Sequence, residues 1–329
     1  MTERADLDRL LGKLEPEVRK AFEAAVRNHA ARIDLRALTD ALARGDMQAA
    51  IEIASLKPKD VYTISEALRG AFFSAANVAG NGGRGIIGQF QFNGRHPEAI
   101  AWAERNSATL VTRLTTESRD AVRATITGGF DLNRGVQAVA RDIAGRRVGA
   151  ARVGSMVGLT GPQAASIMRA RVGLSSGDAP AMRDYLKLAL RDRRFDKIVR
   201  RAIKEGRAIK TADLEKILEA HKAKALGYRA KVIAQAETFK AAAVGRDQSY
   251  RQMLSMEGVT GVSVRWQHNL SAEPRIEHVA MGGTVVQLGQ PFVFPDGTAM
   301  LYPHDETAPA RHVIGCKCIA IYRVQVEKG

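Results

Sequence analysis

Apolar residues recur at three- and four-residue spacing along most of the first 260 positions, which is the period of amphipathic helices. The helices that this pattern predicts among the first 80 residues lie at 7–14, 17–33, 35–45 and 61–80. Two more are predicted at 99–114 and 118–130, and the pair Gly128-Gly129 is expected to break the second of them. The chain is therefore expected to begin with a helical bundle over residues 1–80.

A glycine-rich stretch separates the two helical regions. Six glycines lie between Gly80 and Gly94, which superficially resembles a loop that holds phosphate. The stretch has no Lys-Ser/Thr ending and no strand before it, and both belong to a nucleotide-binding loop of that kind. We therefore expect a connector over residues 81–96 and a basic helical region over 97–259.

Three segments carry signals for the start of a helix. Thr160 and Gln163 have the spacing of a capping box, with a proline in the first turn, so a helix is predicted to begin just after Thr160. Asp178, followed by a proline, signals a second start. Thr211, followed by acidic residues, signals a third, which opens a helical run without proline to about Met256.

The period changes after Gly261, where short segments rich in β-branched and aromatic residues predict strands. These segments lie at 261–267, 284–289, 291–294, 299–302 and 319–326. The turn Pro295-Asp296-Gly297 predicts a hairpin. The expected fold class is a multidomain α+β protein, mostly α-helical in its N-terminal and central regions, with a small α+β module over residues 260–329.

Charge is distributed unevenly. The 329 residues carry 50 Lys and Arg against 35 Asp and Glu, and the interval from Arg141 to Lys210 holds seventeen basic residues against six acidic ones. Such asymmetry indicates an acidic or polyanionic partner for this interval. Because few aromatic residues accompany these charges, we expect contact along a DNA backbone or an acidic protein surface rather than base stacking.

An amphipathic helix with a basic face is predicted inside this interval. Its apolar side holds Phe195, Ile198, Val199, Ala202 and Ile203. The alternative to a contact surface is an ordinary solvated face. The expected contact residues for DNA or an acidic partner are Arg194, Lys197, Arg201 and Lys204, with Lys210 continuing the same spacing.

Neither a membrane-spanning helix nor a secretory signal is expected. The sequence has no apolar run of about 18 residues, and it starts with charged residues. The two cysteines, Cys316 and Cys318, are too few for a disulfide framework. We expect no membrane partner and a protein that works in the cytoplasm or inside an assembly built there.

The C-terminal module concentrates residues with chemical potential. Four of the seven histidines and both cysteines lie between His268 and Cys318. Imidazole and thiolate are the usual zinc ligands, so His278, Cys316 and Cys318 are candidate metal ligands. A Cys-x-Cys pair is closer than the familiar zinc spacings, so no cofactor is expected and a hydrogen-bonded structural motif is favoured over a zinc site.

A catalytic interpretation is also open. His278 would act as general acid or base, and Arg275, three residues earlier, would stabilise an anion, as in a nuclease or another phosphotransfer enzyme. No established catalytic motif is present, so no enzyme class follows from spacing alone.

The order of residues across the last hundred positions closely resembles the C-terminal module of the Mu F-like phage head morphogenesis proteins, which are minor head proteins. The pattern is an Ala/Glu/Thr-rich helix, a Trp, an Arg-x-x-His motif, a Gly, a Phe, a Pro-Gly-Asp-like turn and a closing Cys-x-Cys. The matching residues are Arg229, Ala234, Glu237, Thr238, Trp266, Arg275, His278, Gly282, Phe292, Pro303, Asp305, Cys316 and Cys318.

The sequence also departs from the family pattern. An Asp and an additional Arg commonly precede the Arg-x-x-His motif, and here these positions hold Ala272 and Glu273. The Gly of the Pro-Gly-Asp turn is replaced by His304, and the Asn before the first cysteine by Gly315. If the acidic and basic pair serves a reaction in some relatives, this chain lacks it, so the departures weaken the enzyme interpretation.

The resemblance implies a non-enzymatic virion protein of the head interior or portal vertex that acts in capsid assembly in the host cytoplasm. Its implied partners are the phage portal protein and capsid or scaffold proteins, with packaged DNA as a further partner. The basic central region agrees with the DNA contact. A non-specific DNA-binding protein and an enzyme that uses His278 and Arg275 are the alternatives, because a shared fold does not settle activity.

Overall fold

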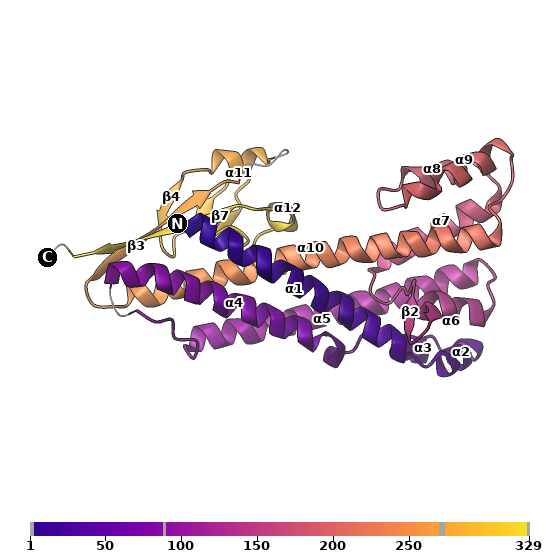
Figure 1. Cartoon of the computed structure of the whole chain (residues 1–329), viewed down its shortest axis with the longest axis horizontal. Coiled ribbons are helices and arrows are strands. Elements are labelled where there is room, and N and C mark those ends of the chain that lie inside the picture. The colour runs from indigo at the N-terminus through magenta and orange to yellow at the C-terminus, as the bar shows by residue number, and fades with distance from the viewer. Residues whose placement is uncertain (1–2, 88–89, 270–273, 328–329) are drawn as a thin grey trace. The chain divides into compact units, whose positions relative to one another are not determined.

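The computed structural model describes residues 3–87, 90–269 and 274–327 (Figure 1). It is mostly helical, with small antiparallel sheets near the C-terminus, so the predicted fold class is confirmed. None of the helices in this described part combines the length and apolar character that crossing a bilayer needs. Ala272 and Glu273 lie outside the described residues.

The twelve α-helices of the described residues are α1 (Glu3–Arg32), α2 (Leu35–Ala43), α3 (Met47–Ala54), α4 (Pro58–Ile87), α5 (Pro97–Asp131), α6 (Val136–Ala144), α7 (Gly161–Ser176), α8 (Ala179–Lys187), α9 (Asp196–Lys204), α10 (Thr211–Leu254), α11 (Ile276–Ala280) and α12 (Ala310–Val313). A short 3-10 helix spans Arg193–Phe195. The strands are β1 (Arg146–Val148), β2 (Ala151–Val153), β3 (Val259–Gln267), β4 (Val285–Gln287), β5 (Phe292–Val293), β6 (Ala299–Met300) and β7 (Ile319–Val326).

The chain divides into two compact units, each assembled from separate stretches. The first unit contains Met1–Ala21, Ile64–Ala108 and Val232–Gly329, and the second contains Phe22–Thr63 and Thr109–Lys231. The units are discontinuous because α1, α4, α5 and α10 each contribute residues to both. The division into consecutive ranges at 80, 96 and 259 stays a prediction.

The predicted helix starts are confirmed. The Thr160 hydroxyl accepts a hydrogen bond from the Gln163 backbone N–H at 3.3 Å, and the Gln163 side chain accepts one from the Thr160 N–H at 3.1 Å. This reciprocal pair satisfies two donors that a helix start leaves unpaired. Asp178 caps α8 through the Ala181 N–H, and α10 begins at Thr211.

The expected break at Gly128-Gly129 is wrong, because α5 continues through both residues to Asp131. The two glycines serve close packing instead. A Cβ on Gly129 would lie 2.6 Å from a methyl of Val139, and one on Gly128 would lie 3.0 Å from the Cβ of Met168. A glycine that a neighbouring helix requires looks the same in sequence as a glycine that ends a helix.

Two other helix boundaries differ from expectation. Helix α4 runs on to Ile87, into the range expected as a connector. The basic helix is shorter than its charge pattern suggested, because α9 ends at Lys204 and leaves Arg194 in the 3-10 turn and Lys210 outside the helix. A turn with Gly206 at φ +59° follows α9, and it stops the helix before Lys210.

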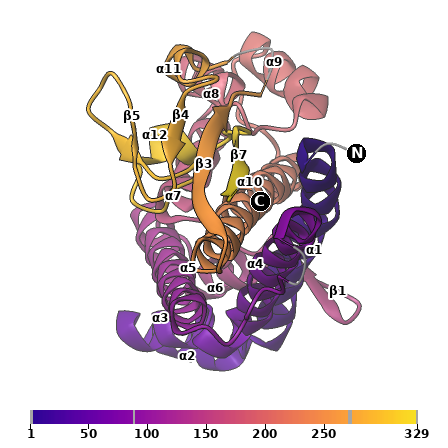
Figure 2. The same cartoon turned by 90° about the vertical axis from the view of Figure 1, so that its left-hand side faces the viewer.

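The first unit contains the three-stranded antiparallel sheet, in which β3 lies between β4 and β7 (Figure 2). Tyr250 of α10 stacks on Tyr322 of β7 with ring centroids 4.2 Å apart. Val262, Val264 and Trp266 alternate along β3 and are each almost fully buried. One side of β3 therefore joins the hydrophobic core of this unit, as the period of two requires.

The predicted hairpin is confirmed, although its strands are short. Strands β5 and β6 pair through Phe292 with Met300 and Val293 with Ala299. Asp296 accepts the N–H of Thr298 at 2.9 Å in the turn between them, where Gly297 has φ +82°. This turn fixes the place of Asp296, which matters for the site below.

The second unit is helical apart from the β1–β2 hairpin, and it has a separate core. A network of buried charges lies beside that core. Arg171 donates to Asp142 at 2.9 Å and to Glu215, and Lys222 donates to Asp142 at 3.4 Å. Burial lowers the pKa of Lys222, whereas the carboxylate of Asp142 favours its charged form.

Candidate metal centre

Three segments of the C-terminal module bring its histidines and cysteines together. Helix α11 carries His278, α12 carries His312, and the segment that leads into β7 carries Cys316 and Cys318. Pairing of Trp266 with Ala320 between β3 and β7 fixes the position of the cysteine segment. These side chains are separated by up to 40 residues and meet only because the module folds.

The distances in this cluster suit a tetrahedral zinc ion. The Nδ1 atom of His278 lies 3.5 Å from the sulfur of Cys316 and 3.5 Å from the sulfur of Cys318. The three donor atoms lie within 4.8 Å of one another, and all three residues are buried. With zinc–nitrogen and zinc–sulfur bonds of about 2.0 and 2.3 Å, the nitrogen–sulfur edge of a tetrahedron is about 3.5 Å.

A second histidine and a carboxylate hold His278 from outside. The Nε2 atom of His278 lies 3.1 Å from Nδ1 of His312, and Nε2 of His312 lies 2.9 Å from the Asp296 carboxylate. Arg311 also donates to Asp296, at 2.6 Å. Arg311 and His312 lower the pKa of Asp296, so its carboxylate stays ionised. A carboxylate–histidine chain behind a ligating imidazole is a common support of metal sites.

The two thiols differ in how easily they lose a proton. The hydrogen bond with Cys316 lowers the pKa of Cys318, and His278 and the Asn269 backbone add to this effect. The same interaction and burial raise the pKa of Cys316. The Cys316 sulfur accepts the Cys318 backbone N–H at 3.3 Å. A cation between the sulfurs would allow both to be thiolates, as metal binding requires.

Aromatic rings enclose the cluster. The rings of Trp266 and His278 lie 5.5 Å apart in an edge-to-face arrangement, and Trp266 contacts Phe292 and Phe294 in the same way at 5.3 and 5.2 Å. Trp266 is fully buried, and His278 is 1% exposed. The cluster is thus closed to solvent.

The catalytic candidates, His278 and Arg275, are poorly placed to reach a large substrate. His278 is buried, and its two ring nitrogens already contact the thiols and His312. The guanidinium of Arg275 donates to the backbone carbonyl of Ile314, and so it joins α11 to the loop after α12. The side chains of both residues therefore make contacts that stabilise the module, and these contacts explain their positions without a catalytic role.

Other residues of the family pattern also have local structural contacts. Phe292 is buried beside Trp266, and Asp305 accepts the N–H groups of Leu301 and Thr307. A Cβ on Gly282 would approach the Val279 carbonyl oxygen to 2.9 Å. Pro303 is buried.

Four pattern residues lie on α10, outside the cluster, namely Arg229, Ala234, Glu237 and Thr238. Glu237 and Thr238 are buried in the first unit, where Glu237 pairs with Lys240 at 2.6 Å. Arg229 belongs to the second unit, where it donates to the Gly158 carbonyl and to Glu117.

The predicted basic face forms on α9. Lys197, Arg201 and Lys204 are exposed, and in the described ranges no carboxylate lies within ion-pair distance of them. Arg194 differs, because it forms a two-pronged ion pair with the buried carboxylate of Asp192 at 2.6 to 3.1 Å. Val199 and Ala202 are buried on the opposite side, as the pattern predicted.

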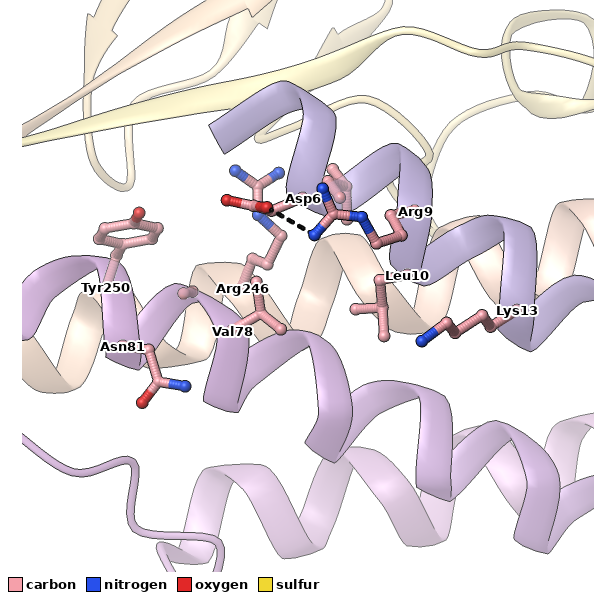
Figure 3. Close-up of a pocket in the computed structure, with 10 residues that line it drawn as sticks. Asp6, Arg9, Leu10, Lys13, Val78, Asn81, Arg246 and Tyr250 are labelled. Carbon is pink, nitrogen blue, oxygen red and sulfur yellow. Dashed lines mark hydrogen bonds and ion pairs between the residues drawn. The ribbon is translucent and has the colours of Figure 1, made fainter. Parts of the chain in front are cut away.

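The first unit also contains a cavity of about 540 Å³ that the sequence did not predict (Figure 3). Asp6, Arg9 and Lys13 of α1 line it together with Arg246 and Tyr250 of α10. Arg9 is paired with Asp6 at 3.3 Å. Charged side chains of both signs line the cavity, and none of its lining residues is a histidine or a cysteine.

Sequence reasoning identified the three candidate ligands and missed Asp296, which it assigned to a turn alone. The turn motif gave no sign that its carboxylate would meet a histidine sixteen residues later. The comparisons with protein-family models, with curated proteins and with solved structures found no match.

Proposed function

We propose that this chain is a phage minor head protein that acts in capsid morphogenesis at the portal vertex, and that a zinc ion holds its C-terminal module together. One observation carries the proposal. Five of the residues that the resemblance identified along the sequence lie side by side in one buried cluster, namely Trp266, His278, Phe292, Cys316 and Cys318. Their order thus has a common structural cause, which is the core of this module.

Zinc is the metal that the donor set favours. Thiolate and imidazole together select zinc over magnesium and calcium, which prefer oxygen. The separations of His278 from the two sulfurs fit a tetrahedral edge, and the Asp296–His312 pair would orient the imidazole. A small module with a short sheet gains stability from such an ion.

Burial of the cluster favours a structural ion over a reaction centre. A catalytic zinc ion keeps a position open to water or substrate, whereas His278, Cys316 and Cys318 are each 3% exposed or less. The non-enzymatic interpretation therefore fits this geometry better than the nuclease interpretation.

The zinc part is tested by elemental analysis of the purified full-length chain. We expect about one zinc per chain in the wild type and loss of that zinc in the Cys316→Ser/Cys318→Ser variant. His268→Ala is the matched control in the same module, since His268 is half-exposed and lies outside the group of candidate ligands. Wild-type protein purified without zinc and still folded would contradict this part.

The head part is tested by inactivating the gene in the phage that encodes the chain. We expect fewer complete heads under the electron microscope, and recovery when the wild-type gene is supplied in trans. Supply of the Cys316→Ser/Cys318→Ser variant should restore heads poorly, because the module that docks in the head would be destabilised. Normal numbers of filled heads without the chain would contradict a role in morphogenesis.

A further inference from the structure

A cavity of about 380 Å³ lies in the second unit, and most of the residues that line it are charged. They come from the loop before α6, from α6, from the β1–β2 hairpin and from α10. Three of them are acidic, and the four basic ones are Arg134, Arg141, Arg146 and Lys222. A cavity of this size is large enough for a small ligand or for one group of a larger one.

The three carboxylates of the cavity already have cationic partners within the protein. The ion pairs are Asp142 with Arg171 at 2.9 Å and with Arg134 at 3.1 Å, Glu215 with Arg171 at 3.0 Å, and Glu219 with Arg146 at 3.1 Å. A bound cation would have to compete with these arginines for every carboxylate. The cavity is therefore poorly suited to a cation.

The basic side chains, in contrast, have donors to spare. Lys222 is 6% exposed, and its one hydrogen bond within the described part of the chain is the long contact of 3.4 Å with Asp142. The Nε atom of Arg134 is buried and has no hydrogen-bonding partner among the described residues. Arg141 is exposed, and no carboxylate of residues 3–87, 90–269 or 274–327 pairs with it. An ammonium group has three N–H donors, and leaving buried donors unpaired opposes folding.

The backbone holds these groups at the cavity without help from a ligand. Asn133, at φ +52°, turns the chain after α5, and the N–H of Arg134 donates to the Gly129 carbonyl at 3.1 Å. Thr211, the first residue of α10, also lines the cavity. The first turn of a helix carries partial positive charge and N–H groups without helical partners. Side chains and backbone therefore both favour an anion here.

We propose that this cavity binds a phosphate group, with Lys222 and Arg141 as its main contacts. Guanidinium groups match the oxygens of a phosphate in pairs, and a lysine ammonium binds it as a point charge. The phosphate belongs to a small molecule or to the backbone of DNA. Burial lowers the pKa of Lys222, and a phosphate beside the ammonium would favour its charged form. The inference is independent of the zinc ion and concerns the second unit alone.

The test is calorimetric titration of the full-length chain with inorganic phosphate, at an ionic strength held constant with sodium chloride. We expect saturable binding of about one phosphate per chain to the wild type. Lys222→Met removes the charge and keeps an unbranched side chain, and it should weaken binding by at least about tenfold, because a hydrogen bond to a charged group is lost. Lys216→Met is the matched control, since Lys216 is exposed on the same helix and does not line the cavity.

Arg141→Gln is the second variant, because an exposed residue can be replaced without disturbing the packing of the unit. It should also bind phosphate more weakly than the wild type, with unchanged circular dichroism. Absence of saturable phosphate binding by the wild type would overturn the proposal. Binding that is equal in the wild type and Arg141→Gln and in Lys222→Met would overturn it as well, and would leave the charged network as a support of the helices.

The source of the phosphate is then identified with a short DNA duplex. If DNA supplies it, the duplex should displace inorganic phosphate, and Lys222→Met should retain less DNA than Lys216→Met does. If a small molecule supplies it, the two variants should retain DNA equally while Lys222→Met still binds inorganic phosphate more weakly. Both results support a phosphate site in this cavity, and they differ in the molecule that occupies it.

Discussion

At the scale of single residues, the C-terminal module depends on polar groups that are buried next to one another. Nδ1 of His278 contacts two sulfurs, and its Nε2 contacts His312, which in turn contacts Asp296. Removing one member leaves its neighbours buried and unpaired, at a cost of about 1–3 kcal/mol for each group. The cluster should therefore respond as a unit to substitution.

His278→Ala in the full chain should lower the free energy of unfolding by at least about 1–3 kcal/mol and abolish zinc binding. Tryptophan fluorescence during urea unfolding measures this, because the Trp266 ring lies 5.5 Å from that of His278. His268→Ala is the control and should unfold as the wild type does. Equal stability of His278→Ala and the wild type would remove His278 from the structural core.

Asp296→Asn tests the outer support. The variant keeps a side chain of the same size and loses the charge that pairs with Arg311 and His312. We expect zinc affinity to fall by about 10- to 100-fold with the same sulfur and nitrogen neighbours, as is typical of an outer-shell partner. Competition with a zinc chelator measures the affinity, and an unchanged value would show that His312 needs no carboxylate.

At the scale of elements, the sequence predicted those that carry a local signal. The capping box at Thr160, the cap at Asp178, the helix start at Thr211 and the turn at Asp296 each involve neighbours within a few residues, and all four are present. The helix α3, the β1–β2 hairpin and the continuity of α5 through Gly129 were not predicted. Close contact with Val139 explains why residue 129 is a glycine inside a helix, and no local sequence pattern reveals that contact.

The candidate metal centre was predicted in its residue types and not in its arrangement. His278, Cys316 and Cys318 were recognisable because imidazole and thiol are zinc ligands wherever they gather. The roles of His312 and Asp296 depend on contacts between loops that are distant in sequence, and on which ring nitrogens are already used.

The basic face of α9 makes a separate prediction. Charge reversal at Lys197, Arg201 and Lys204, with Arg194, should abolish retention of DNA by the full chain and leave its helical content unchanged. Binding by the wild type should weaken steeply as salt rises, because phosphate contacts release counterions. The matched control reverses four exposed basic residues of the second unit outside this face, namely Arg27, Arg36, Arg44 and Lys59.

Filter binding at several salt concentrations measures retention, and circular dichroism measures helical content. Equal loss in both variants would show that total charge decides binding rather than α9. Unchanged binding in the α9 variant would leave its basic residues as a solvated face.

The start of the α9 segment should be sensitive to acid. Arg194 lowers the pKa of Asp192 to about 2, from an ordinary value of 3.8. Because the folded-state pKa is lowered, the stabilisation is fully present above about pH 4 and is lost as the pH falls toward 2. Urea unfolding of the wild type and Asp192→Asn should therefore differ at pH 5 and converge near pH 2. A constant difference across this range would contradict the ion pair.

At the scale of the whole molecule, the proposal assigns different tasks to different parts of the chain. The C-terminal module supplies a zinc-held body within the first unit, and the basic helix α9 in the second unit supplies a surface for DNA or an acidic partner. This division follows from charge, since the interval from Arg141 to Lys210 is strongly basic and the module is formally neutral. A protein with these two properties suits a position between a capsid and its genome.

The most direct test of the central claim is the number of copies of this chain in purified phage heads, measured by quantitative mass spectrometry. The account predicts a small fixed number per head for the wild type and a clear reduction for the Cys316→Ser/Cys318→Ser variant, whose module lacks its zinc. Absence of the wild-type chain from purified heads would contradict the account.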